Sequence, residues 1–220
     1  MHQGAVRVRV RAGARARAGA LTPGAADATA VVLAGGRSSR FGRDKLGEPI
    51  GGEPMLHHAI RRAAEVCRAV VVVLAPGGPE PPMPADVPVR FARDSLEGEG
   101  PLEGAHAGLL AVSTELAVLV AGDMPELVPA VLDEMLAIAR ERSADAVVLR
   151  DGERLRPLPS VVRVAPAVAR AETLLHGGHR RLRELLGALD PAVVEEAAWH
   201  ALDPERRTLV DVDEPRDLDG

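Results

Sequence analysis

A chain of 220 residues is long enough for one domain with a sizeable core, and its net charge of −5 argues against extensive binding to nucleic acid. Two Phe, one Trp and no Tyr leave too few aromatic side chains for recognition of bases by stacking. The single Cys67 excludes an internal disulfide and suits the reducing cytoplasm, and no apolar run approaches the roughly 20 residues that span a bilayer.

The first 27 residues differ in composition from the rest of the chain. They are rich in Ala, Arg and Gly and contain no apolar stretch long enough for a secretory signal. The alternation of Val and Arg over residues 6–10 is compatible with a strand, and the segment could also be a basic arm for a partner or the product of a misplaced start codon. We expect a flexible leader over residues 1–27, followed by a single domain over residues 28–220.

From Ala28 onward, short runs of β-branched residues alternate with stretches of helical periodicity. This order is typical of a three-layer, Rossmann-like α/β fold, in which a mostly parallel sheet carries helices on both faces. Strands are expected over residues 30–33, 69–74, 87–91, 116–120 and 146–149. Helices are expected over residues 54–66, 102–112 and 128–142, where apolar residues recur at intervals of three and four.

The second half of the chain is less regular. An Asp-Gly pair at residues 151–152 has the signature of a tight hairpin, so we expect one antiparallel excursion there. Two helices should follow, over residues 166–175 and 179–189. The stretch RTLVDVDEP at residues 207–215 predicts a last strand that enters a terminal turn, with its proline opening a short helix.

The loop after the first predicted strand, LAGGRSSRFGRDK, is both glycine-rich and positively charged. In an open α/β sheet, ligands bind at the carboxyl ends of the strands. Gly35, Gly36 and Gly42 allow the backbone to turn sharply and to approach a ligand, so that its N–H groups form an anion-binding concavity. Arg40 and Lys45 add full charges to these dipoles. The loop is therefore suited to a polyphosphate.

The spacing of this loop differs from two common phosphate-binding motifs. A Walker A motif requires G-x4-G-K-[ST], but five residues separate Gly36 from Gly42, and Arg43 stands where Lys is required. The dinucleotide fingerprint G-x-G-x-x-G fails because Gly35 and Gly36 are adjacent. Neither motif accounts for the loop.

The loop resembles the signature LAGGxSxRxGxDK of nucleotidyltransferases related to molybdenum cofactor guanylyltransferase. Its fixed positions are all met, by Leu33, Ala34, Gly35, Gly36, Ser38, Arg40, Gly42, Asp44 and Lys45. Three later stretches are similar to the family in the same order: RDSLEGEGPLEGAHAGL at 93–109, LVAGDMPEL at 119–127 and LVDVDEPRDL at 209–218. The resemblance implies a fold like that of the nucleotide-diphospho-sugar transferases.

The resemblance also implies an activity. The family transfers GMP from GTP to the terminal phosphate of molybdopterin and releases pyrophosphate, with Mg²⁺ as cofactor, in the cytoplasmic synthesis of the molybdenum cofactor. GTP and molybdopterin would then be the substrates, and proteins that synthesise or insert the cofactor would be partners. Neither nucleic acid nor a membrane is expected as a partner.

The resemblance assigns nucleotide contacts to Leu33, Ala34, Gly35, Gly36, Ser38, Gly42 and Lys45. Within this loop, Arg40 and Lys45 would be catalytic, because they stabilise the negative charge that grows on the leaving pyrophosphate. The alternative is that both are solvated loop charges.

Acidic residues at predicted strand ends are the candidate metal ligands. The resemblance makes Asp123 a catalytic ligand of Mg²⁺, which prefers carboxylate oxygens together with substrate phosphates and water. Its alternative role is a helix N-cap. Asp213 is the expected second contact to the metal or the phosphates, and Asp211 lies two residues earlier on the same face.

Asp94 is placed by the resemblance near the base, where a carboxylate can accept hydrogen bonds from guanine N1–H and the exocyclic amine. Its alternative role is to cap a turn. Gly100 and Gly104 flank the following turn, where the absence of side chains would let the base or ribose come close. Outside this set, His57 and His58 are expected to be surface or internally hydrogen-bonded histidines, and the arginines over residues 180–183 a solvated helix face.

Two positions depart from the family pattern. Pro76 stands about where an Asn often contacts the nucleotide, and Leu158 precedes Pro159 where Gln or His is common. The base and the acceptor are therefore less firmly indicated than the transfer reaction.

Other functions remain compatible with these residues. The nearest is the same chemistry with a cytidylyl donor or with a sugar or polyol phosphate as acceptor, although GPLEGAHAGL favours the guanylyl branch. A non-catalytic nucleotide-binding domain is a second, and a structural interaction module a third. The intact Arg40, Lys45, Asp123 and Asp213 favour catalysis over the second.

Overall fold

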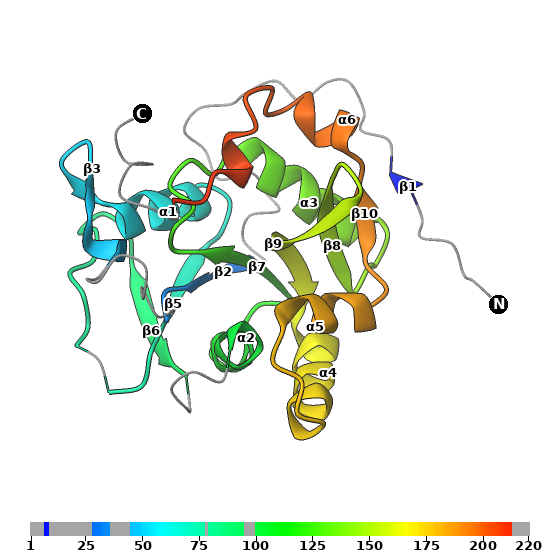
Figure 1. Cartoon of the computed structure of the whole chain (residues 1–220), viewed down its shortest axis with the longest axis horizontal. Helices are drawn as coiled ribbons and strands as arrows, with labels where there is room; N and C mark the ends of the chain where they lie inside the picture. The colour runs from blue at the N-terminus through cyan, green and yellow to red at the C-terminus, as the bar shows by residue number, and fades with distance from the viewer. Residues whose placement is uncertain (1–6, 9–27, 36–44, 78, 95–99, 213–220) are drawn as a thin grey trace.

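The structure, a computed structural model of the chain, describes residues 7–8, 28–35, 45–77, 79–94 and 100–212. Its main sheet has eight strands in the order β1-β10-β8-β9-β7-β2-β5-β6 (Figure 1). From edge to edge these are β1 (Arg7–Val8), β10 (Ala192–Val194), β8 (Ala146–Asp151), β9 (Arg154–Arg163), β7 (Leu116–Ala121), β2 (Ala28–Leu33), β5 (Ala69–Leu74) and β6 (Val89–Arg93).

Every neighbouring pair in this sheet is parallel except those that include β9, which runs antiparallel to both β7 and β8. In the centre, Val31 of β2 is level with Val71 of β5 and Leu119 of β7. The mostly parallel sheet with one antiparallel excursion is thus confirmed. The excursion begins at the predicted Asp151-Gly152 turn, where Gly152 adopts a φ of 57°.

Helices cover both faces of the sheet, which confirms the three-layer prediction (Figure 1). The helices of one face are α1 (Met55–Ala64), α3 (Pro129–Glu141) and α6 (Glu196–His200), and those of the other are α2 (Pro101–Leu110), α4 (Val164–His176) and α5 (Leu182–Ala188). Each face has its own apolar core, because successive side chains of a strand point to opposite faces. Val32 belongs to the first core and Val31 to the second.

Helix α2 lies unusually close to the sheet because of Gly108. A Cβ atom at this position would overlap Val31 Cγ1 and would lie 2.8 Å from Val73 Cγ2. The two valines come from the central strands β2 and β5. The missing side chain therefore sets the distance between the helix and the centre of the sheet.

The predicted last strand is wrong over its described part. Residues 207–209 form the 3₁₀ helix η3 (Arg207–Leu209), and residues 210–212 belong to no strand. Arg206 takes a left-handed conformation with a φ of 60°, which turns the chain just before η3. The carboxylate of Asp203 then accepts the N–H groups of Arg207 and Thr208, which leaves them unavailable for a β ladder. The expected short helix at Pro215 lies outside the described residues.

Five short elements were not predicted. These are the 3₁₀ helix η2 (Lys45–Gly47), the hairpin strands β3 (Pro49–Ile50) and β4 (Glu53–Pro54), the strand β10 and the helix α6. All are five residues or shorter, too short for a periodic pattern. Within the predicted leader, the structure describes only β1, which pairs in parallel with β10 and matches the alternation of Val and Arg noted in the sequence.

Within the described residues, none of the helices combines the length and the apolar character that a membrane crossing requires.

Candidate functional site

The chain segments that leave β2 and β7 are joined at the carboxyl ends of the central strands. Ala34 donates its backbone N–H to the carbonyl oxygen of Val73 at 2.9 Å, and Gly122 donates to the carbonyl oxygen of Leu33 at 3.0 Å. The loops that follow these strands therefore start from fixed, adjacent points.

An ion pair stands at this edge of the sheet. Lys45 Nζ lies 2.8 Å from Asp123 Oδ2, although the two residues are 78 positions apart in the sequence. Lys45 begins the 3₁₀ helix η2 (Lys45–Gly47), whereas Asp123 follows β7. The side chain of Lys45 is 11% exposed and that of Asp123 26%, so solvent reaches the carboxylate more than the amine. The structure brings together two predicted catalytic residues.

Gly122 allows η2 to approach the end of β7. A Cβ atom on Gly122 would lie 3.1 Å from Leu56 Cδ1 and 3.3 Å from Leu46 Cδ1. Leu46 directly follows Lys45, so a larger residue at position 122 would require the ends of these leucine side chains to shift beside the ion pair. Gly122 was not among the residues predicted from the sequence, although its place immediately before Asp123 at a strand end was a usable signal.

The predicted nucleotide contacts Leu33, Ala34 and Gly35 lie directly at the end of β2. A Cβ atom on Gly35 would lie 3.2 Å from the backbone nitrogen of Ala75, which follows β5. This close passage of two backbones explains a glycine here independently of any ligand. The loop residues Gly36, Ser38, Arg40 and Gly42, together with Asp213, lie outside the described residues, and their roles stay predictions.

Asp94 follows β6 and lies beside α2. Its N–H donates to the carbonyl oxygen of Leu74 at 3.0 Å, and its Oδ2 would lie 3.8 Å from a Cβ atom on Gly104. The strand order places β5 and β2 between β6 and β7. At the usual spacing between neighbouring strands, about 14 Å therefore separates the axes of β6 and β7, the strands that precede Asp94 and Asp123. The predicted base contact and the ion pair thus lie along one edge, three strand positions apart.

Gly100 is required by a protein contact. It has a φ of 93°, and a Cβ atom there would lie 2.8 Å from the carbonyl oxygen of Arg180. The same oxygen accepts the N–H of Leu102 at 3.2 Å. The close approach at Gly100 is therefore to the segment between α4 and α5, and a contact with nucleotide stays a prediction.

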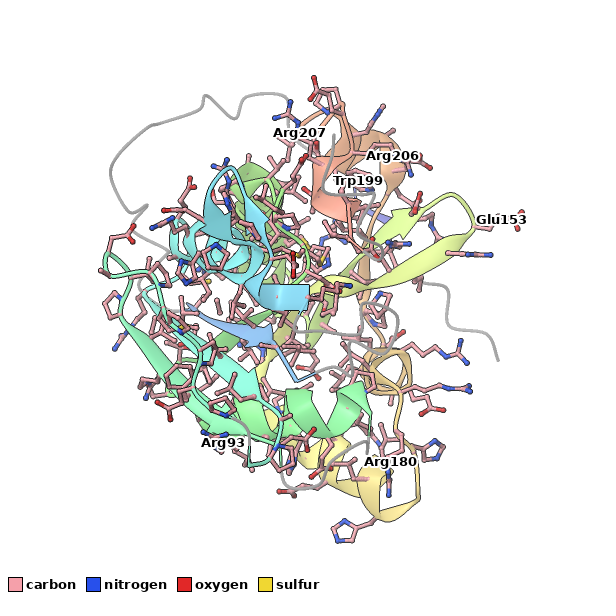
Figure 2. All side chains as sticks on the ribbon, turned by 60° about the vertical axis from the view of Figure 1, so that its left-hand side comes forward. Arg93, Glu153, Arg180, Trp199, Arg206 and Arg207 are labelled. Atoms are coloured by element: carbon pink, nitrogen blue, oxygen red, sulfur yellow. The ribbon has the colours of Figure 1, made fainter. Side chains whose placement is uncertain are left out.

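The histidines expected to be surface or internally hydrogen-bonded are both hydrogen-bonded. His57 Nε2 lies 2.8 Å from the carbonyl oxygen of Pro82, and His58 Nε2 lies 2.9 Å from that of Ile50. Arg180, expected on a solvated helix face, lies before α5 (labelled in Figure 2) and donates to the carbonyl oxygens of Leu175 and His179. These contacts give the three side chains structural roles.

Asp123 is the carboxylate that the structure describes beside Lys45 at this edge of the sheet. No group of three His, Cys, Asp or Glu side chains able to hold a metal occurs in the described part of the chain. Mg²⁺ bound to a nucleotide does not need such a group, because it keeps several waters and takes one or two carboxylates together with phosphates. The partly exposed Asp123 fits this kind of site and does not fit a metal held by protein alone.

A separate hollow of about 280 Å³ lies between β9 and α5. Its lining includes Leu155, Pro157, Arg183 and Leu186, and none of the predicted site residues belongs to it. Arg183 and Asp190 are charged residues of its wall. The hollow and the ion pair are thus distinct candidate sites.

Comparison with known proteins agrees with the geometry. Residues 30–193 match the family model described as MobA-like NTP transferase domain. The chain is 36% identical over 193 residues to the "probable molybdenum cofactor guanylyltransferase" of Mycobacterium avium, covering 86% of this chain and 91% of that protein. A protein of the same name from Chloroflexus aggregans is 34% identical over 195 residues, covering 86% and 90%.

Solved structures show the same fold. Molybdopterin-guanine dinucleotide biosynthesis protein A from Archaeoglobus fulgidus superposes with a TM-score of 0.71 at 21% identity, covering 87% of this chain and 95% of that one. The 2-C-methyl-D-erythritol 4-phosphate cytidylyltransferase from Thermus thermophilus gives a TM-score of 0.61 at 20% identity, covering 86% and 94%. The fold is thus shared by proteins named for different nucleotides.

Proposed function

Because the chain belongs to the family of MobA-like NTP transferase domains and is a nucleotidyltransferase, we propose that it transfers GMP from GTP to the terminal phosphate of molybdopterin and releases pyrophosphate. The observation that carries the proposal is the ion pair between Lys45 and Asp123 at the carboxyl ends of β2 and β7. The names of the curated relatives supply the guanylyl donor and the molybdenum cofactor.

The reaction is an in-line displacement at the α-phosphorus of GTP. An oxygen of the acceptor phosphate forms a bond to this phosphorus, and the bond to the bridging oxygen of the β-phosphate breaks, so pyrophosphate leaves with the electron pair. The acceptor phosphate is already an anion, so the protein need not supply a general base. Its task is to position the two substrates and to stabilise the growing negative charge.

Lys45 is suited to the second task. Its amine is largely buried, and a charge in such a place acts more strongly on a neighbouring phosphate than one in water. We infer that Lys45 contacts phosphate oxygens of GTP, together with Arg40 and the backbone N–H groups of the glycine-rich loop. Asp94 would select guanine over cytosine, because guanine offers its carboxylate two adjacent donors, the N1–H and the exocyclic amine.

Asp123 would hold the Mg²⁺ ion, with Asp213 as the second acidic contact. When bound, Mg²⁺ neutralises charge on the phosphate oxygens and helps to orient them. The carboxylate of Asp123 is suited to this role because it is the more exposed member of the ion pair and stands at the strand end. We place the reaction in the cytoplasm.

The proposal is tested by measuring pyrophosphate released from each of the four nucleoside triphosphates in the presence of Mg²⁺ and molybdopterin. We expect release that requires the acceptor and is fastest with GTP. Fastest release with CTP would instead indicate a cytidylyltransferase and remove the proposed role of Asp94. Binding of GTP without release, with acceptor present, would favour a non-catalytic nucleotide-binding domain.

A further inference from the structure

The loop of residues 122–128, which carries Asp123 from β7 to α3, is bonded to the end of β2 through Gly122 and to a later segment of the chain at two further points. The N–H of Val212 donates to the carbonyl oxygen of Asp123 at 3.1 Å. The N–H of Val128, the residue that caps α3, donates to Thr208 Oγ1 at 3.2 Å. Both partners belong to residues 203–212, which we call the strap. The strap thus holds both ends of the loop that bears the proposed metal ligand.

Asp203 and Thr208 form the buried centre of the strap. Asp203 is 3% exposed and Thr208 0%. The carboxylate of Asp203 accepts the N–H of Arg207 at 3.0 Å and that of Thr208 at 2.7 Å. These bonds satisfy a carboxylate that would otherwise be costly to bury. Thr208 is therefore held by its backbone while its hydroxyl oxygen holds Val128.

The strap is also attached to the hairpin between β8 and β9. Arg206 forms ion pairs with Asp151 at the end of β8 and, at 2.7 Å, with Glu196 of α6. Its guanidinium lies 5.5 Å from the ring centroid of Trp199, and Figure 2 shows these two side chains together on the same side of the molecule. Trp199 Nε1 in turn donates to the carbonyl oxygen of Arg150 at 2.8 Å. These contacts of Arg206 fix the position of the strap just before Thr208.

We propose that Thr208, held by Asp203, is a positioning residue for Asp123. The inference rests on the proposed function, because it requires that Asp123 binds the metal of the nucleotide complex. Without the hydroxyl, Val128 N–H loses its acceptor at the α3 end of the loop. The bonds of Gly122 and Asp123 to Leu33 and Val212 remain, but both lie at the β7 end. A displacement of about 1 Å in such a site can lower a rate by about 10²-fold.

The test compares Thr208→Val with Thr208→Ser and with the control Thr29→Val. Thr29 is also 0% exposed and hydrogen-bonded, with its Oγ1 2.9 Å from Thr114 Oγ1, but it stands at the amino end of β2. The three readouts are the Mg²⁺ dependence of transfer, the affinity for GTP without Mg²⁺, and hydrogen exchange in residues 121–128.

We expect Thr208→Val to lower kcat by about 10- to 100-fold, to raise the Mg²⁺ concentration for half-maximal rate and to speed exchange in residues 121–128. GTP affinity without Mg²⁺ should stay unchanged, and Thr208→Ser should restore both the rate and the exchange. Thr29→Val should lower the melting temperature and leave the Mg²⁺ curve unchanged.

Two outcomes overturn the inference for different reasons. In the first, Asp123→Asn abolishes transfer, but Thr208→Val and Thr29→Val show the same Mg²⁺ dependence and the same hydrogen exchange in residues 121–128. Only the positioning role of Thr208 is then wrong. If Asp123→Asn itself keeps the rate and the Mg²⁺ curve of the native protein, the metal-binding role of Asp123 in the proposed function is wrong, and the inference is overturned with it.

Discussion

The two ends of the parallel strands carry similar polar contacts but differ in what surrounds them. At the carboxyl ends, Lys45 pairs with Asp123, and Gly122 lets the two segments approach each other. At the amino ends, Arg163 pairs with Glu115 and also donates to the carbonyl oxygen of Ala139. The first pair joins η2, which follows the glycine-rich loop in the sequence, to the segment after β7, whereas the second joins the last residue of β9 to the residue before β7.

The amino ends are closed by side chains. Thr114 donates its hydroxyl to the carbonyl oxygen of Leu116 at 2.8 Å, and its Oγ1 lies 2.9 Å from Thr29 Oγ1, from which it can accept. Cys67, just before β5, is 3% exposed, and burial raises the pKa of its thiol to about 12. A polar pair at this end serves the stability of the sheet. The residues around an ion pair, and not the pair itself, thus indicate whether it is placed for chemistry or for stability.

The largest effect on the rate is expected when the ion pair at the carboxyl ends is broken, with the pair at the amino ends as the control. Lys45→Met should lower the rate of transfer by about 10²- to 10³-fold, because it removes a charge from the proposed phosphate site. Arg163→Met should leave the rate per folded molecule unchanged, although it too removes a cation from an ion pair. Initial rates of pyrophosphate release, corrected for the folded fraction, measure both. Equal losses in the two variants would contradict the comparison.

A smaller effect is expected from glycines that differ in their surroundings. Gly108→Ala should lower the free energy of unfolding by about 1–3 kcal/mol, because the new methyl group overlaps Val31 at the centre of the sheet. Gly187→Ala in α5 should raise it by about 0.5 kcal/mol, since no atom lies within 4 Å of the added Cβ and alanine favours the helix.

Urea unfolding of these two variants is the measurement. Transfer by Gly108→Ala should fall only as far as its folded fraction falls, because Gly108 contacts the core and not the ion pair. The changes in the free energy of unfolding should have opposite signs in the two variants. A stabilised Gly108→Ala would show that α2 does not approach the sheet as described.

The smallest effect is expected at Glu134 of α3. Burial, with Glu141 and Asp133 nearby, raises the pKa of this carboxyl in the folded protein. A carboxyl whose pKa is higher in the folded than in the unfolded protein stabilises the fold at a pH below its unfolded pKa. This contribution is lost as the pH rises through its folded pKa. Glu134→Gln should therefore melt slightly higher than the native protein at pH 7, and the difference should vanish below about pH 4. Melting curves across this range test the sign, and a variant that melts lower at pH 7 would contradict it.

Much of the scaffold could be predicted because its signals are local. The run AVVVVL of β5 and the Asp-Gly turn at residues 151–152 each specify an element through neighbouring residues alone. The strand predicted from residue 207 onward was wrong because the structure there depends on contacts with residues outside the segment. Thr208 and its neighbours have a strand-like sequence pattern. However, the carboxylate of Asp203 accepts the N–H of Thr208, and the hydroxyl oxygen of Thr208 accepts the N–H of Val128.

The site follows the same division. The sequence indicated Lys45 and Asp123 as residue types in suitable places, but their contact across 78 positions required the fold. Gly100 shows the reverse case, because a pattern that indicated nucleotide contact is also explained by the carbonyl of Arg180. A motif thus identifies which residues matter more reliably than it identifies what each residue touches.

The most direct measurement is a crystal structure with Mg²⁺ and a GTP analogue whose α,β bridging oxygen is replaced by methylene, so that transfer cannot occur. We predict triphosphate oxygens in contact with Lys45 Nζ and Mg²⁺ bound to Asp123. Triphosphate bound instead in the hollow between β9 and α5, away from this pair, would contradict the account.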